Sequence, residues 1–309
     1  MYCRWRKLNK KTQSKKGKGY LIRLADGQVW HMTASEEISP WVGRLASMME
    51  LGEYQSKGYP RLIFVRGRSI ETPANSMAQK NLPEKGWGSR DFRSVQLWFH
   101  PEVPDVICEI GPGSDHELDI LRMWLSLDPI YQRAQESGGL PFHAALIERD
   151  GMGVLLAAPG DTGKSTCCMR IPHPWRALCD DEALVVQNDQ KQYLVHPFPT
   201  WSDYLWRRSR RTWNVQHYVP LKALFFLKQA EVDEALPMKE SQAALYANNA
   251  AIQVSRRTWR HMDRTEVTVT RKRLFENACQ LAKAIPAFIL SVSISGRFWE
   301  EMEKVIEDR

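Results

Sequence analysis

The stretch "AALIERDGMGVLLAAPGDTGKSTCCMRI", residues 144–171, decides the fold. An apolar run leads to a turn at Asp150-Gly151, and a second apolar run leads to a loop that closes with Gly163-Lys164-Ser165. Asp-Gly supplies the positive φ angles that a tight hairpin needs, and a short amphipathic segment follows the loop. The stretch therefore predicts strand, turn, strand, loop and helix in that order.

A strand, a glycine-bearing loop and a helix form a phosphate cradle. Backbone amides face inward, the helix N-terminus adds partial positive charge, Lys164 reaches the β and γ phosphates, and Ser165 Oγ binds Mg²⁺. We expect glycine at Gly160 and Gly163 because a Cβ would obstruct the turn or the phosphate. Ala158 stands where G-x-x-x-x-G-K-[ST] has its first glycine, and a chance Gly-Lys-Ser in a surface turn is the alternative. The candidate nucleotide-binding residues are Gly160, Asp161, Thr162, Gly163, Lys164, Ser165 and Thr166.

Acidic residues follow the next predicted strand. The segment "RALC" runs into Asp180-Asp181-Glu182, and Asp180 lies sixteen residues after Lys164. Phosphoryl transfer needs one carboxylate to position Mg²⁺ and, for a hydroxyl acceptor, another to accept its proton. Two aspartates at a strand end supply both, whereas a solvated acidic turn is the alternative. His143 begins the strand before the loop and is either a partner of the carboxylate or phosphate, or a structural histidine.

The remaining pattern predicts an α/β fold with a mixed sheet. A hairpin is expected over residues 19–34 and a helix over 36–51, and Ser114 and Glu117 fit a capping box at the start of a helix over 115–127. Further strands are expected over 183–189, 192–198, 222–228 and 286–293, and a helix over 296–308. Strands interleaved with helices indicate the α/β class, and the hairpins argue against a purely parallel sheet.

The formal net charge of +7 is concentrated in two runs, residues 7–18 and 207–213. The first is interpreted as a solvated tail, with a nucleic-acid arm as the alternative. The second, "RRSRRTW", lies among Trp201, Trp206 and Trp213; it forms either a surface for anionic groups or a helix face whose tryptophans enter the core. No recognisable nucleic-acid module accompanies this charge. Six cysteines without metal spacing, and the lack of a signal-like or membrane-spanning run, predict a reduced, cytoplasmic protein.

The segments "FHAALIERDGMGVLLAAPGDTGKST" and "ALCDDEALVV" resemble the HPr kinase/phosphorylase family, whose catalytic core is similar to that of phosphoenolpyruvate carboxykinase. The resemblance implies a P-loop-containing core of that type over residues 101–309, after a small N-terminal α/β domain over 1–100. It implies Asp180, His143 and Lys164 as catalytic residues, with Asp180 taking the proton of the acceptor hydroxyl. It also implies Ser165 and Asp181 as Mg²⁺ ligands, although the roles of the adjacent aspartates are exchangeable.

Other segments add to this resemblance. "HPFPTWSD" resembles small HPr-kinase-like proteins of peptide-modification clusters, and "RLADGQVWHM" and "AIPAFILSVSISGRFWEEME" resemble kinase-like SynChlorMet cassette proteins, companions of radical SAM enzymes. The downstream glycine-rich signature of the full HPr kinase family is absent, so phosphorolysis, hexameric assembly and HPr as substrate are poorly supported.

Together these features predict an ATP- and Mg²⁺-dependent kinase for a Ser or Thr hydroxyl of a small protein or peptide. Arg207, Arg208, Arg210 and Arg211 are candidates for docking the acceptor, and radical SAM proteins of the same cluster are candidate partners. One alternative is a kinase for a small metabolite such as free serine. A second alternative is an accessory protein that binds nucleotide without turnover.

Overall fold

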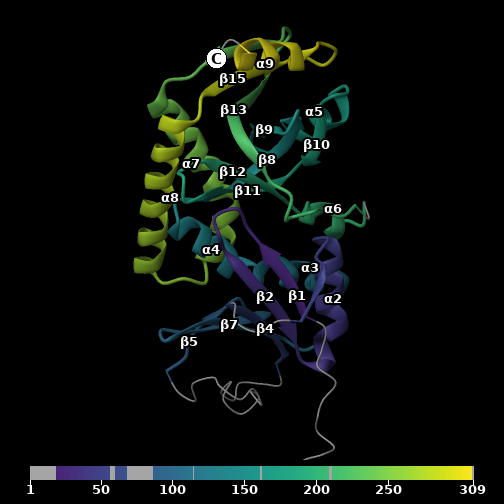
Figure 1. Cartoon of the computed structure of the whole chain (residues 1–309), viewed down its shortest axis with the longest axis vertical. Helices are drawn as coiled ribbons and strands as arrows, with labels where there is room; N and C mark the ends of the chain where they lie inside the picture. Colours follow the sequence, from purple (N-terminus) through teal and green to yellow (C-terminus); the bar gives the residue numbers. More distant parts are fainter. Residues whose placement is uncertain are drawn as a thin grey trace, which may run out of the picture. The chain divides into compact units, whose positions relative to one another are not determined.

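The computed structural model describes residues 19–55, 60–67, 86–113, 115–160, 162–208 and 211–307 (Figure 1). The chain forms two compact units, one of Met1–Ile22 and Val29–Ser126 and one of Arg23–Gln28 and Leu127–Arg309. A division at residue 100 would separate β6 (Val95–His100) from its antiparallel neighbour β7 (Val103–Ile110). Within the described ranges, every helix is too short or too polar to cross a bilayer. The basic run 7–18 lies outside the described residues.

The first unit is built on a seven-stranded mixed sheet in the order β3-β1-β2-β4-β7-β6-β5. Strands β2, β4 and β7 are parallel, whereas β5, β6 and β7 pair antiparallel. Its other elements are β1 (Gly19–Arg23), β2 (Val29–Ala34), η1 (Glu36–Ile38), α2 (Ser39–Met48), β3 (Glu53–Tyr54), β4 (Arg61–Arg66), β5 (Gly88–Asp91) and α3 (His116–Leu125). The predicted strands over 19–34 are confirmed as neighbours β1 and β2, and Gly27 in their turn has φ +83°.

Helix α3 begins differently from the prediction. Asp115 is its N-cap, and the Asp115 side chain accepts the backbone N–H of Glu117 at 3.2 Å. Ser114, the expected capping residue, lies outside the described residues. A carboxylate beside the positive end of the helix therefore replaces the expected Ser–Glu capping box.

The second unit contains a closed ring of paired strands. The pairing runs β8–β11–β12–β13–β9 and returns to β8. Strands β10, β14 and β15 extend this arrangement, and β13 is parallel to both β9 and β15. The bounds are β8 (Leu140–Arg149), β9 (Met152–Ala157), β10 (Arg176–Cys179), β11 (Glu182–Gln187), β12 (Tyr193–Phe198), β13 (Val219–Gln229), β14 (Glu234–Pro237) and β15 (Ala287–Val292).

Strand β8 changes its neighbour part-way along one edge. Its residues 140–143 pair with β11, and its residues 146–148 pair with β10. Glu182 lies opposite His143, and Cys179 lies opposite Leu146. Asp180 and Asp181 are the two residues between β10 and β11, so they stand at the point where the neighbour changes.

Helices cover the second unit: α4 (Asp128–Glu136), α5 (Lys164–Arg170), α6 (Trp201–Leu205), α7 (Glu240–Trp259), α8 (Arg264–Ala284) and α9 (Phe298–Glu307). Helices α7 and α8 lie side by side, and α7 also contacts β8 (Figure 1). Alanines of α7, among them Ala243, Ala247 and Ala251, are buried, which allows close approach of the helix to its neighbours. Neither α7 nor α8 was predicted from the sequence, whereas the α/β class, the mixed sheet and the helix α9 are confirmed.

Candidate functional site

The loop of residues 158–163 joins β9 to α5, as the sequence predicts. Thr162 Oγ1 donates to Pro159 O at 3.0 Å and lies 3.4 Å from Gly160 O, which closes the loop on itself. Gly163 has φ +107°, a conformation that side chains rarely adopt, so glycine is required there. A Cβ on Gly160 would meet no protein atom within 4 Å, so the turn itself does not require glycine there, and the expected obstruction of a phosphate stays a prediction. Asp161 lies outside the described residues.

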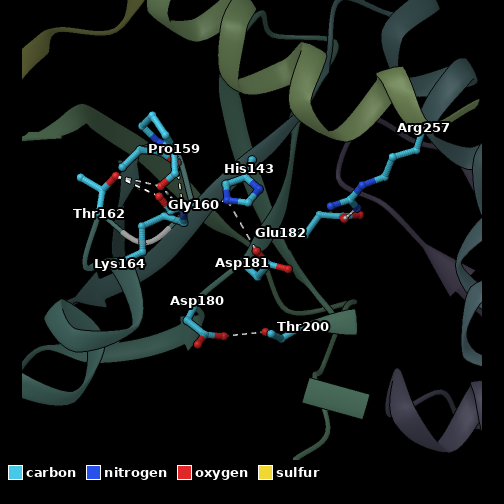
Figure 2. A network of polar contacts seen from close by, with 11 residues as sticks. His143, Pro159, Gly160, Thr162, Lys164, Asp180, Asp181, Glu182, Thr200 and Arg257 are labelled. Atoms are coloured by element: carbon cyan, nitrogen blue, oxygen red, sulfur yellow. Dashed lines mark hydrogen bonds and ion pairs between the residues drawn. The ribbon is translucent and has the colours of Figure 1, made fainter. Parts of the chain in front are cut away.

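Lys164, the first residue of α5, is 7% exposed and folds back over the loop. Its Nζ donates to Ala158 O at 2.9 Å and Pro159 O at 3.2 Å, and it lies 2.7 Å from His143 Nε2 (Figure 2). The ammonium group therefore connects the loop to strand β8. Ser165 and Thr166 follow in the first turn of α5, and both are exposed.

His143 is a neutral acceptor in this arrangement. Burial, followed by the charges of Lys164, Arg257 and Arg256, lowers its pKa from 6.5 to about 4. At neutral pH its Nε2 therefore carries a lone pair, which accepts a hydrogen bond from the Lys164 ammonium group, and its Nδ1 carries the hydrogen. Asp181 Oδ1 lies 3.7 Å from the same Nε2, a proximity that becomes an ion pair when His143 is protonated.

The two adjacent aspartates have different partners. Asp180 Oδ1 accepts a hydrogen bond from Thr200 Oγ1 at 2.5 Å, and Thr200 is 3% exposed. Asp181 faces His143, and Figure 2 shows the two carboxylates directed to different neighbours. Burial raises the pKa of Asp181, and the positive charges of Arg257 and Lys164 oppose that rise. Asp181 is thus the aspartate beside His143, the residue that also contacts Lys164.

The sequence analysis missed three residues that contact the acidic run of residues 180–182: Tyr131, Arg257 and Thr200. Glu182 is 1% exposed, and Tyr131 Oη donates to its Oε1. Arg257 Nη1 lies 3.7 Å from Glu182 Oε2 (Figure 2). Tyr131 comes from α4 and Arg257 from α7, and no local spacing relates either residue to the loop. Thr200 follows β12 within "HPFPTWSD", a segment that the sequence singles out without indicating this contact.

Described residues of the basic segment 201–213 contact the strand that leads to the aspartates. Arg211 Nη2 donates to Ala177 O and Leu178 O, at 2.9 and 3.2 Å, in the strand that leads to Asp180. The charges of Asp180, Arg208 and Arg211 all act on Asp203, whose pKa is raised first by burial.

The three tryptophans of the segment 201–213 differ in exposure. Trp201 and Trp213 are buried at 2% and 1%, as the core interpretation predicts, but Trp206 is 62% exposed. Arg207, Arg208 and Arg211 are exposed as well, and Arg210 lies outside the described residues.

A comparison with protein families identifies the chain's relatives. The model of the SynChlorMet cassette protein ScmC family matches residues 106–307. The chain belongs to this family. The matched range includes every candidate site residue named above. A comparison with curated proteins gave no match.

Proposed function

We propose that the chain is an ATP-dependent kinase that transfers the γ-phosphate to a Ser or Thr hydroxyl of a small protein or peptide. The observation that carries the proposal is the convergence of Lys164, His143 and Asp181 from three different elements beside Asp180. A lysine at the start of a helix after a tight loop is the arrangement that binds nucleotide phosphates. An HPr-kinase-like, phosphoenolpyruvate-carboxykinase-like core remains part of this proposal.

The residues present suit Mg²⁺ and a nucleotide. Ser165 and Asp181 offer oxygen ligands, which Mg²⁺ prefers, and Mg²⁺ commonly uses one or two carboxylates together with substrate phosphates. No group of three His, Cys, Asp or Glu side chains suited to a metal occurs in the part of the chain that the structure describes, so phosphate oxygens complete the proposed site. Bound Mg²⁺ would neutralise charge on the phosphates during transfer. Lys164 would exchange its two loop carbonyl contacts for phosphate oxygens.

The different partners of the aspartates divide their roles in this proposal. Asp180 accepts the proton of the acceptor hydroxyl, and the hydrogen bond from Thr200 holds one of its oxygens in place. The acceptor oxygen forms a bond to the γ-phosphorus, the bond to the bridging oxygen breaks, and ADP leaves. Asp181 would hold Mg²⁺, and neutral His143 orients Lys164 by accepting its hydrogen bond.

An acceptor with acidic residues beside its hydroxyl suits the surface of Trp206, Arg207, Arg208 and Arg211. These side chains are exposed, and Arg208 and Arg211 act electrostatically on Asp203 near Asp180. Arginine and tryptophan dominate the binding energy of many interfaces. The family is named for a cassette. We infer that a peptide precursor is the acceptor and that radical SAM enzymes of the same cluster are partners.

The proposal is tested by calorimetric binding of Mg·ATP to the wild-type chain, to Lys164→Ala and to the exposed control Lys272→Ala. We expect binding by the wild type and the control and its loss in Lys164→Ala. Transfer of labelled phosphate to peptides with acidic or basic flanks, or to free serine, then identifies the acceptor class. A folded wild-type chain that binds no Mg·ATP would contradict the proposal, and binding without transfer to any acceptor would favour the accessory role.

A further inference from the structure

Glu182 is a buried carboxylate that the proposed phosphoryl transfer does not use. It is 1% exposed, follows Asp181 directly and lies opposite His143 in the pairing of β11 with β8. A buried charge is costly unless it is paired and hydrogen-bonded. Its presence beside the candidate site therefore calls for a partner of opposite charge.

Two distant elements supply the partners of Glu182. Tyr131 on α4 donates its hydroxyl to Oε1, and burial together with the charge of Glu182 raises the pKa of Tyr131 well above its usual value. The phenol thus remains a donor at neutral pH. Arg257, near the C-terminal end of α7, brings Nη1 to 3.7 Å from Oε2.

Arg257 also stands beside the candidate site. Glu182, whose carboxylate it approaches, directly follows Asp181 and lies opposite His143 in the pairing of β11 with β8. The Arg257 side chain is 35% exposed, whereas that of Glu182 is 2% exposed. Arg257 is therefore anchored at a buried carboxylate while part of its side chain remains accessible to solvent, and it comes from α7, whereas Lys164 comes from α5 (Figure 2).

We propose that Arg257 is a second phosphate-binding cation, directed by Glu182 and Tyr131, that binds the terminal phosphate of the nucleotide together with Lys164. This inference rests on the proposed kinase function. The planar guanidinium group offers several donors in a geometry that matches phosphate oxygens. An arginine supplied by the same chain stabilises the charge of a transferring phosphoryl group in other phosphotransferases.

The test measures Mg·ATP and Mg·ADP affinity by calorimetry for wild type, Arg257→Gln, Arg257→Lys and the control Arg273→Gln. Arg273 is a matched control because its side chain is 36% exposed and it pairs with Glu136 at 3.5 Å. We expect Arg257→Gln to weaken Mg·ATP binding on the order of 10-fold or more, as for loss of a hydrogen bond to a charged group, and Mg·ADP binding by no more than about twofold. Arg257→Lys should retain an intermediate preference for ATP, and the control should match the wild type.

The outcomes separate the two proposals. A wild-type chain that binds neither nucleotide contradicts the kinase proposal and, with it, the role proposed for Arg257. A wild-type chain that binds both, with Arg257→Gln retaining its ATP preference or losing both affinities equally, overturns only the second-cation proposal. If Arg257→Gln does not fold, Arg257→Lys decides, because unchanged ATP preference there would show that the guanidinium does not contact the terminal phosphate.

Discussion

The loop after β9 and the junction between β10 and β11 both contribute to the candidate site, but they differ in the sequence separation of their contacts. Within the loop, Lys164 contacts carbonyls five and six residues earlier. At the junction, Asp180 contacts Thr200, 20 residues away, and Glu182 contacts Tyr131, 51 residues away. The loop is therefore defined by local sequence, whereas the environment of the junction depends on the whole second unit.

The largest expected effect distinguishes the two aspartates of the junction. Asp180→Asn should lower phosphate transfer by ~10²- to 10⁴-fold, because an amide cannot take the acceptor proton, while Mg·ATP binding is kept. Asp181→Asn should instead weaken binding of ATP at low Mg²⁺, with partial recovery at high Mg²⁺. Initial rates and calorimetry at several Mg²⁺ concentrations measure both effects.

The exposed Asp189→Asn serves as the control for this pair, because Asp189 lies in the turn between β11 and β12. Reversed phenotypes would exchange the roles of Asp180 and Asp181. Full transfer by Asp180→Asn would remove the proposed base.

The same contrast explains what the sequence could predict. The hairpin at Asp150-Gly151, the loop and the start of α5 follow from turn chemistry and spacing, and the structure has all three, with φ of +53° and +75° in the turn. The sequence analysis missed helix α7 and, with it, Arg257. The contact of Arg257 with Glu182 arises from the packing of α7 on β8, which no local pattern predicts. Periodicity within one segment carries no information on which distant charge will meet it.

The stability of the junction should depend on the buried carboxylate of Glu182 and its contacts with Tyr131 and the partly exposed Arg257. Glu182→Ala removes this carboxylate from both partners, so the free energy of unfolding should fall by ~2–3 kcal/mol, as for loss of hydrogen bonds to a charged group. Urea unfolding measures this change. The comparison is Glu136→Ala, which breaks a more exposed pair with Arg273 and should cost below ~1 kcal/mol. Equal costs for the two variants would show that Glu182 is not a specific anchor.

A smaller effect is expected from the contact between Thr200 and Asp180. Thr200→Val keeps the shape of the buried side chain but removes the hydroxyl donor. Asp180 is accessible enough for a water molecule to replace part of the lost hydrogen bond. We expect a loss of ~1–2 kcal/mol in the free energy of unfolding and a transfer rate lowered by less than about 10-fold. Thr200→Ser should restore both, and a Ser variant no better than Val would assign the effect to packing.

The smallest expected effect concerns the electrostatic interaction between Lys164, at the end of the loop, and His143 on β8. The pKa of His143 is about 4 in the folded chain, against an ordinary value of 6.5 that applies to the unfolded chain. Between pH 6.5 and 4, His143 is therefore protonated in the unfolded chain but neutral in the folded chain. Its contribution to stability is therefore complete above pH 6.5 and is lost as the pH falls toward 4.

Burial is the first cause of this shift, and the charge of Lys164 is the second. Lys164→Ala should raise the pKa of His143 and reduce the loss of stability between pH 6.5 and 4, by about 1 kcal/mol or less. His196 on β12 also has a pKa of about 4 but owes it to burial and His217, so its contribution should persist in the variant. Urea unfolding across this pH range measures the difference from the wild type. An unchanged pH dependence would mean that Lys164 and His143 are neighbours without electrostatic coupling. The expected change would mean that Lys164 opposes protonation of His143, and that in its absence a protonated His143 pairs with Asp181.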